Sequence, residues 1–146
     1  MNSTGDFRFR ARQALIGTHF RVVTRSTPSF TSGEVSTRVR PRLSTRVTSR
    51  RRGAVRLKAT VSPGLPGATA TLQRRTRSGR WFAVKRKPVD TVDELRSTVA
   101  FKAKRKPRVA RFFRVKVKPA TAAYVAVKGS AIRVSKRPRD RDRDRD

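Results

Sequence analysis

Regular alternation of apolar and polar residues between positions 55 and 72 constrains the fold of this sequence more than any other feature. Every second residue from Val55 to Val61 is apolar, and the residues between them are arginine, lysine and threonine. Ala68 to Leu72 repeats the alternation with threonine between the apolar positions. A period of two predicts strands with one buried face and one solvated face.

Turn signals separate these strands. Pro63-Gly64 and Pro66-Gly67 follow the first strand. In each pair the proline has a fixed φ angle and the glycine tolerates a positive φ angle, which are the two properties that a type II turn requires. Ser78-Gly79 predicts a hairpin after the second strand, and Trp81 then opens a third strand. The stretch from 55 to 81 therefore predicts antiparallel β-structure.

A small set of apolar residues is expected to form the framework of the core. Of the neighbours Trp81 and Phe82, only one can face the interior of a strand pair, and we expect it to be Trp81. The expected framework is Val55, Leu57, Val61, Leu72, Trp81, Phe113 and Val115.

Residues 90 to 101 carry conflicting signals. The spacing of Thr91 and Glu94 resembles a capping box, which favours a helical turn. The apolar residues that follow Glu94 lie at even spacings, as residues on one face of a strand do. We expect a loop or a single helical turn over residues 90–94 and a strand over residues 95–101.

Two parts of the chain resemble each other. Residues 20–22, Phe-Arg-Val, match residues 113–115, and residues 38–39 match residues 133–134, at a period of about 95 residues. Because the match is short and rich in arginine, chance resemblance is the alternative. The repeat predicts three parts: residues 1–40 as the C-terminal strands of a truncated copy, residues 41–136 as a complete copy, and residues 137–146 as a disordered Arg-Asp tail.

The motifs of the central stretch resemble a known family. VSPGLPGA at 61–68, LQRR at 72–75 and GRW at 79–81 are similar to Ig-like β-sandwich repeats of secreted and cell-surface proteins of actinobacteria. The resemblance implies an all-β, fibronectin-like two-sheet sandwich. It also implies a non-catalytic structural or adhesion module located outside the cell or in the cell envelope.

The charge balance points to anionic partners. The chain has 39 Lys and Arg residues against 9 Asp and Glu residues, a formal net charge of +30. Such a field attracts nucleic acids, cell-wall polymers and acidic glycans alike. The alternative to selected polyanion binding is that the arginines only fill exposed positions of the strands. No stretch has the roughly 18 apolar residues that a membrane-spanning helix needs, and no secretory signal is visible.

Cationic residues cluster at the predicted turns, where the ends of a sandwich carry its binding loops. Aromatic residues do not interleave with these clusters along the sequence, as a base-stacking surface would require. The candidate polyanion-binding residues are Arg74, Arg75, Arg77, Arg80, Lys85, Arg86, Lys87, Lys102, Lys104, Arg105 and Lys106.

Catalytic chemistry has little basis in the sequence. His19 is the only histidine, cysteine is absent, and no phosphate-binding loop or nucleophile motif is present. Asp90, Asp93 and Glu94 form the one acidic cluster outside the tail, and neighbouring cations are its simplest partners. We therefore predict no catalytic residues, no metal and no cofactor.

Two functions from different classes follow. The first is a structural or adhesion module that binds anionic polymers through basic loops. The alternative is an intracellular, ribosome-associated-like protein that binds nucleic acid, which the charge and the Arg-Asp tail favour. Exposed strand edges also allow self-association between copies of the chain.

Overall fold

The computed structural model describes residues 17–24, 30–51, 54–104 and 110–134. The regular structure in these ranges consists of strands, so the all-β class predicted from the sequence is confirmed. No helix that could cross a membrane is found in this part of the chain. The strands are β1 (His19–Phe20), β2 (Val35–Ser36), β3 (Arg42–Arg51), β4 (Ala54–Ser62), β5 (Thr69–Arg75), β6 (Trp81–Pro88), β7 (Asp90–Asp93), β8 (Arg96–Lys104), β9 (Arg111–Lys118), β10 (Val127–Lys128) and β11 (Ile132–Val134).

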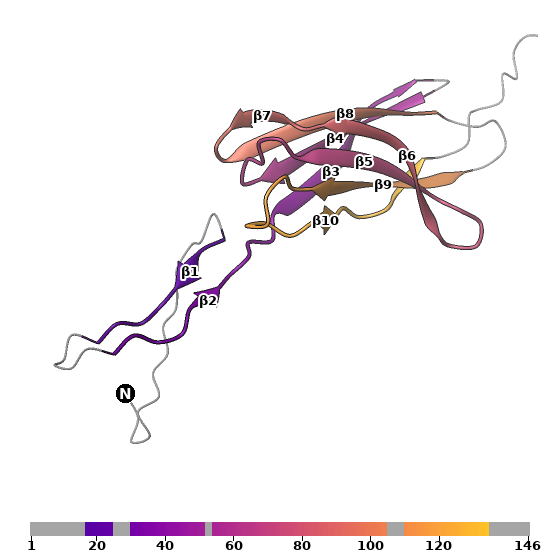
Figure 1. Cartoon of the computed structure of the whole chain (residues 1–146). Helices are drawn as coiled ribbons and strands as arrows, with labels where there is room; N and C mark the ends of the chain where they lie inside the picture. Colours follow the sequence, from indigo (N-terminus) through magenta and orange to yellow (C-terminus); the bar gives the residue numbers. More distant parts are fainter. Residues whose placement is uncertain (1–16, 25–29, 52–53, 105–109, 135–146) are drawn as a thin grey trace, which may run out of the picture.

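Two antiparallel sheets make up the body of the molecule. One has the strand order β3-β4-β8-β7, and the other has the order β10-β9-β5-β6, with β11 also paired to β9. Their inner faces contribute to one shared hydrophobic cluster, and Figure 1 shows the two sheets lying over each other. This arrangement is compatible with a β-sandwich.

Alternating residues of both sheets fill the core. On β4 and β9 every second side chain is buried, as the period of two requires. Phe101 from β8 and Leu65 from the β4–β5 loop add the largest remaining buried side chains. Six residues of the expected framework are each no more than 3% exposed: Val55, Leu57, Val61, Leu72, Phe113 and Val115.

Trp81 is the exception, and the expectation that it enters the core was wrong. The β5–β6 hairpin places Trp81 opposite Arg75, on the outer face of the sheet, and Phe82 opposite Arg74, on the inner face. Trp81 is half-buried there beneath the guanidinium of Arg114, whose carbon lies 4.2 Å from the ring centre. Gln73 holds Arg114 in place, because its Oε1 accepts a hydrogen bond of 2.8 Å from Arg114 Nε.

The expectation for residues 90–94 was also wrong. Residues 90–93 form β7, which pairs with β8 through Asp90 opposite Thr98. Strand pairing overrides the local capping signal, because the backbone of Val89 is already tied to the other sheet by a hydrogen bond to Ala68. The Asp93 carboxylate accepts a hydrogen bond from Leu95 N and so stabilises a turn, after which β8 begins.

Gly64 packs against the turn that follows β7. Its N–H donates to Glu94 O at 2.8 Å, and a Cβ at this position would overlap the carbonyl oxygen of Asp93. We therefore expect Gly64→Ala to lower the free energy of unfolding by about 1–3 kcal/mol, a cost typical of overpacking. Chemical denaturation measures this change. Gly33→Ala is the matched control, because nothing lies within 4 Å of a Cβ there; equal effects of the two substitutions would contradict the argument.

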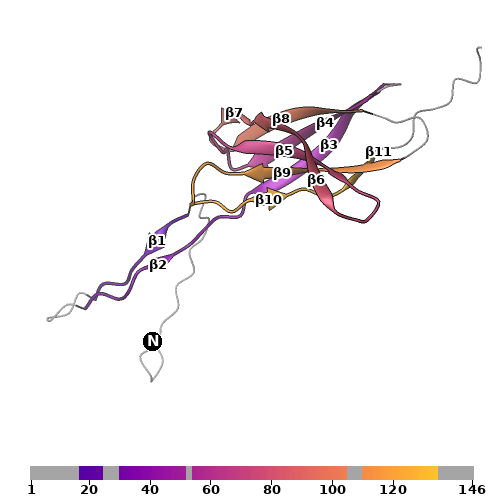
Figure 2. The same cartoon turned by 45° about the vertical axis from the view of Figure 1, so that its right-hand side comes forward.

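The N-terminal hairpin is separate from the two large sheets. β1 and β2 pair as a two-stranded sheet with Phe20 opposite Val35, and Figures 1 and 2 show it extending away from the body. The chain then rejoins the body where Val39 exchanges hydrogen bonds with the segment from Ala123 to Val125. Residues 1–16 and the Arg-Asp tail lie outside the described residues.

Candidate polyanion-binding surface

The ends of several strands lie together at one end of the two sheets, which we call the basic end. Because the strands are antiparallel, β3, β5 and β8 end here and β4, β6 and β9 begin here, and Figure 1 shows these strand ends on its right-hand side. Arg50, Arg75, Lys104 and Arg111 lie at or next to these strand termini. Strand ends that are distant in sequence therefore place their cations in one region.

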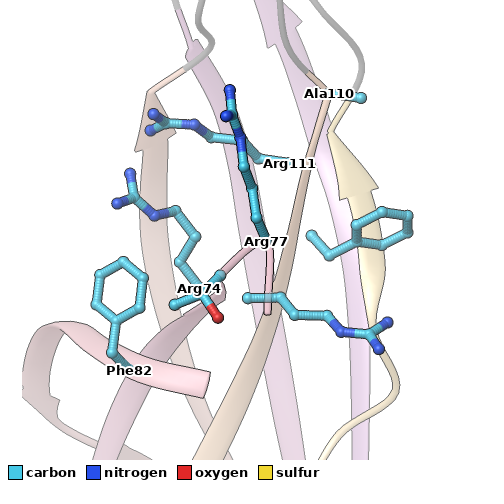
Figure 3. Close-up of a pocket in the computed structure, with 8 residues that line it drawn as sticks. Arg74, Arg77, Phe82, Ala110 and Arg111 are labelled. Carbon is cyan, nitrogen blue, oxygen red and sulfur yellow. The ribbon is translucent and has the colours of Figure 1, made fainter. Parts of the chain in front are cut away.

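An open groove of about 650 Å³ lies at the basic end. Four arginines and two phenylalanines dominate its wall, and Figure 3 shows the side chains of Arg74, Arg77 and Arg111 reaching the upper left part of the view from different directions. The full lining is Arg74, Arg75, Thr76, Arg77, Phe82, Ala110, Arg111 and Phe112. We call these eight residues the arginine groove.

The hairpin that carries Arg77 has a defined local geometry. Thr76 N donates to Arg80 O at 2.7 Å, and the Thr76 hydroxyl accepts a hydrogen bond from Arg80 N. Gly79 has a φ of +86°, a conformation that favours glycine, so the turn predicted at Ser78-Gly79 is present. This turn fixes the position of Arg77 above the groove.

The arginines of the groove lack anionic partners among the described residues. The ion pairs found there join His19 to Glu34 and Arg96 to Asp93, both away from the groove. Burial, and secondarily the positive charge of Arg74, lowers the pKa of Arg111. Arginine nevertheless remains protonated at neutral pH, because its usual pKa lies far above neutrality. The groove therefore concentrates positive charge that an external anion could neutralise.

Phe82 supports this cluster. The guanidinium carbon of Arg74 lies 4.5 Å from the centre of the Phe82 ring, within the range of a cation–π interaction. The contact orients Arg74 without neutralising it. Phe82 and Phe112 are 36% and 39% exposed, so both rings remain accessible to a ligand.

The structure brings only part of the predicted set together. Arg74, Arg75 and Arg77 line the groove, and Arg80 is exposed in the same hairpin. Lys102 and Lys104 are exposed on β8, toward the same end. Arg105 and Lys106 lie outside the described residues.

The predicted cationic cluster on β6 lies away from the arginine groove. Lys85, Arg86 and Lys87 pair with residues 70–72 of β5, farther from the hairpin turn than the groove residues. Lys87 is occupied by a structural contact, because its Nζ donates a hydrogen bond of 2.9 Å to Ala100 O in the other sheet. The three residues therefore do not belong to the arginine groove.

Sequence reasoning missed Arg111, Phe82 and Phe112 as groove residues. Arg111 lies two residues before the buried residue Phe113 on β9, so its side chain is on the inner face of that strand. That signal was available in the sequence. The position of Phe112 and Phe82 in the groove lining could not be predicted from the sequence, because it depends on which strands pair.

The acidic cluster at residues 90–94 forms no metal site in the described structure. Asp93 pairs with Arg96 at 3.6 Å and also accepts the hydrogen bond from Leu95. No group of three or more histidines, aspartates or glutamates among the described residues is arranged to hold a metal ion. The arginine groove thus remains the strongest candidate site.

Searches against protein-family models, curated proteins and solved structures find no match for this chain. The resemblance to Ig-like repeats therefore rests on the sequence motifs alone.

Proposed function

We propose that this chain is a non-catalytic Ig-like structural or adhesion module of an extracellular or cell-envelope protein, and that it binds anionic polymers through its basic end. The observation that carries the binding role is the arginine groove, which four arginines line without a carboxylate partner among the described residues. Guanidinium groups bind phosphate, sulfate and carboxylate groups through paired hydrogen bonds.

The strand order supports the Ig-like assignment. Ig-like sandwiches place strands A, B, E and D in one sheet and C, F and G in the other, and an additional C′ strand pairs with C. Numbering from β3 as strand A gives A-B-E-D for β3-β4-β8-β7, and G-F-C-C′ for β10-β9-β5-β6. The extracellular or envelope location comes from the family resemblance.

Binding is driven by the release of counterions. Arg74 and Arg111 repel each other in the free protein, which is one of the causes that lower the pKa of Arg111. An anion between them removes this repulsion and displaces the ions condensed on the polymer. Solvent ions screen the Coulomb attraction less at Arg74 and Arg111, which are half-buried, than at Arg75 and Arg77, which are exposed.

Salt dependence tests the proposal. If the four groove arginines each contact one anionic group, affinity for heparin falls about a hundredfold between 50 and 200 mM salt. Isothermal titration at several salt concentrations measures the slope, and dextran serves as the uncharged control polymer. Affinity that stays constant across this range, or equal binding of dextran, rules the mechanism out.

A further inference from the structure

Strand pairing creates a row of alternating aromatic and cationic residues that does not exist along the sequence. Trp81 on β6 lies opposite Arg75 on β5, and Phe112 on β9 lies opposite Arg133 on β11. The β5–β9 register ends with Arg74 opposite Phe113, which places Arg75 next to Phe112. We call Trp81, Arg75, Phe112 and Arg133 the outer row.

The outer row faces away from the core. Arg75 is three residues from buried Leu72 on β5 and Phe112 is next to buried Phe113 on β9, so both side chains face outward. Trp81 and Arg133 lie opposite them on the same face. Phe112 is 39% exposed and is not one of the residues of the core cluster. Trp81 is half-buried, with Arg114 covering its ring at 4.2 Å.

Further cations continue this face beyond the outer row. Lys116 lies opposite Thr71 on one side and opposite Lys128 on the other. Arg86 also lies opposite Thr71, from β6. The described carboxylates, which are Glu34 and those of residues 90–94, belong to the N-terminal hairpin and to β7 with its following turn. The face thus combines accessible aromatic surface with positive charge.

This combination selects for a particular kind of polyanion. Neighbouring strands lie about 4.8 Å apart, so Trp81 and Phe112 are separated by about 10 Å with Arg75 between them. Unpaired nucleobases stack on aromatic rings and on guanidinium planes, while their phosphates contact cations. A polymer without aromatic groups uses the cations and leaves Phe112 in water. Double-stranded nucleic acid keeps its bases stacked inside the duplex.

We propose that the outer row binds single-stranded nucleic acid, with one base stacked on Phe112 and a neighbouring base on the Trp81–Arg114 pair. Arg75, Arg133 and Lys116 contact the phosphates. This inference rests on the proposed polyanion-binding function and assigns its ligand class.

The single tryptophan provides a direct readout, because Trp81 is the only one in the chain. The test titrates the full chain with a thymidine oligonucleotide and with an abasic oligonucleotide of equal length and charge, following tryptophan fluorescence and anisotropy of a labelled oligonucleotide. The thymidine strand is expected to quench Trp81 and to bind at least fivefold more tightly than the abasic strand. The corresponding duplex is expected to leave Trp81 unquenched.

Variants of Phe112 separate stacking from charge. Phe112→Ala is expected to weaken binding of the thymidine strand between about fivefold and about a hundredfold, and to weaken abasic binding far less. Phe112→Tyr, which keeps an aromatic ring, is expected to retain wild-type affinity. Leu95→Ala, at a 62% exposed apolar residue away from this face, is the matched control and is expected to change neither affinity. Circular dichroism verifies that each variant is folded.

The outcomes separate the two proposals. Equal binding of thymidine and abasic strands, with no effect of Phe112→Ala, overturns the stacking site and leaves general polyanion binding intact. Failure of heparin and of both strands to bind at 50 mM salt overturns the proposed function and this inference together.

Discussion

Replacing Arg74, Arg77 and Arg111 together with glutamine is expected to lower the affinity of the chain for heparin by about a thousandfold at 50 mM salt. Each guanidinium that contacts an anionic group contributes about 0.7–0.9 to the slope of log affinity against log salt. Losing three contacts lowers the slope by about 2–3, and the difference in affinity is largest at low salt. Titrations of the wild type and the triple variant from 50 to 400 mM salt give both quantities.

The matched control removes the same charge from another part of the surface. Arg40→Gln, Arg42→Gln and Arg46→Gln neutralise three exposed arginines on or just before β3, and none of them lines the arginine groove. This control triple is expected to weaken binding far less than the groove triple. Equal losses would show that affinity follows net charge alone, which would contradict a role for the groove geometry.

Phe101→Ala is expected to lower the free energy of unfolding by about 3–5 kcal/mol, the usual cost of removing a buried phenylalanine. Phe101 is 2% exposed and lies on β8 opposite Leu57, in the hydrophobic cluster that both sheets share. The substitution removes apolar contacts and leaves a cavity that a sheet-on-sheet interface cannot easily close. Urea denaturation at constant pH and salt measures the change.

Trp81→Ala is the informative comparison, because tryptophan is the larger residue. Trp81 lies outside the core and contacts Arg114, so its removal is expected to cost about 1 kcal/mol through the lost cation–π contact and partial burial. Leu95→Ala, at an exposed turn, is expected to cost less still. A larger loss for Trp81→Ala than for Phe101→Ala would show that the indole is part of the core after all.

The sequence was informative wherever a single strand carries the pattern. The alternation from Val55 to Val61 marks the residues that β4 buries, and Ser78-Gly79 marks the hairpin that the structure contains. Both features depend on side-chain direction along one strand or on local backbone preference. Such properties are present in a short window of sequence, which is why the all-β class could be predicted.

Features that depend on pairing between strands could not be predicted in the same way. Because Trp81 and Phe82 are neighbours on one strand, their side chains must face opposite sides of the sheet. Only the β5–β6 register decides which one faces inward. Leu72 pairs with Lys85 and Gln73 with Ala83, so Val84 of β6 is an extra residue that shifts the register further. The alternation of aromatic and cationic side chains at the outer row likewise arises across four strands and is invisible along any one of them.

Local signals failed where tertiary structure competed with them. Thr91 and Glu94 have the spacing of a helix start, but residues 90–93 pair with β8. Hydrogen bonds from Val89 N to Ala68 O and from Gly64 N to Glu94 O fix the chain on both sides of this segment. A capping preference of about 1 kcal/mol cannot compete with a strand pair anchored at two points.

The placement of carboxylates gives the folded body an electrostatic polarity. Asp90, Asp93 and Glu94 lie on β7 and in the turn that contacts Gly64, at the end of the sheets opposite the arginine groove. In the field of an approaching polyanion, this asymmetry exerts a torque that turns the groove toward the polymer before contact. For the proposed polyanion binding, encounters are therefore expected to begin in the productive orientation, and the association rate is expected to rise at low ionic strength without any change in the contacts of the bound state.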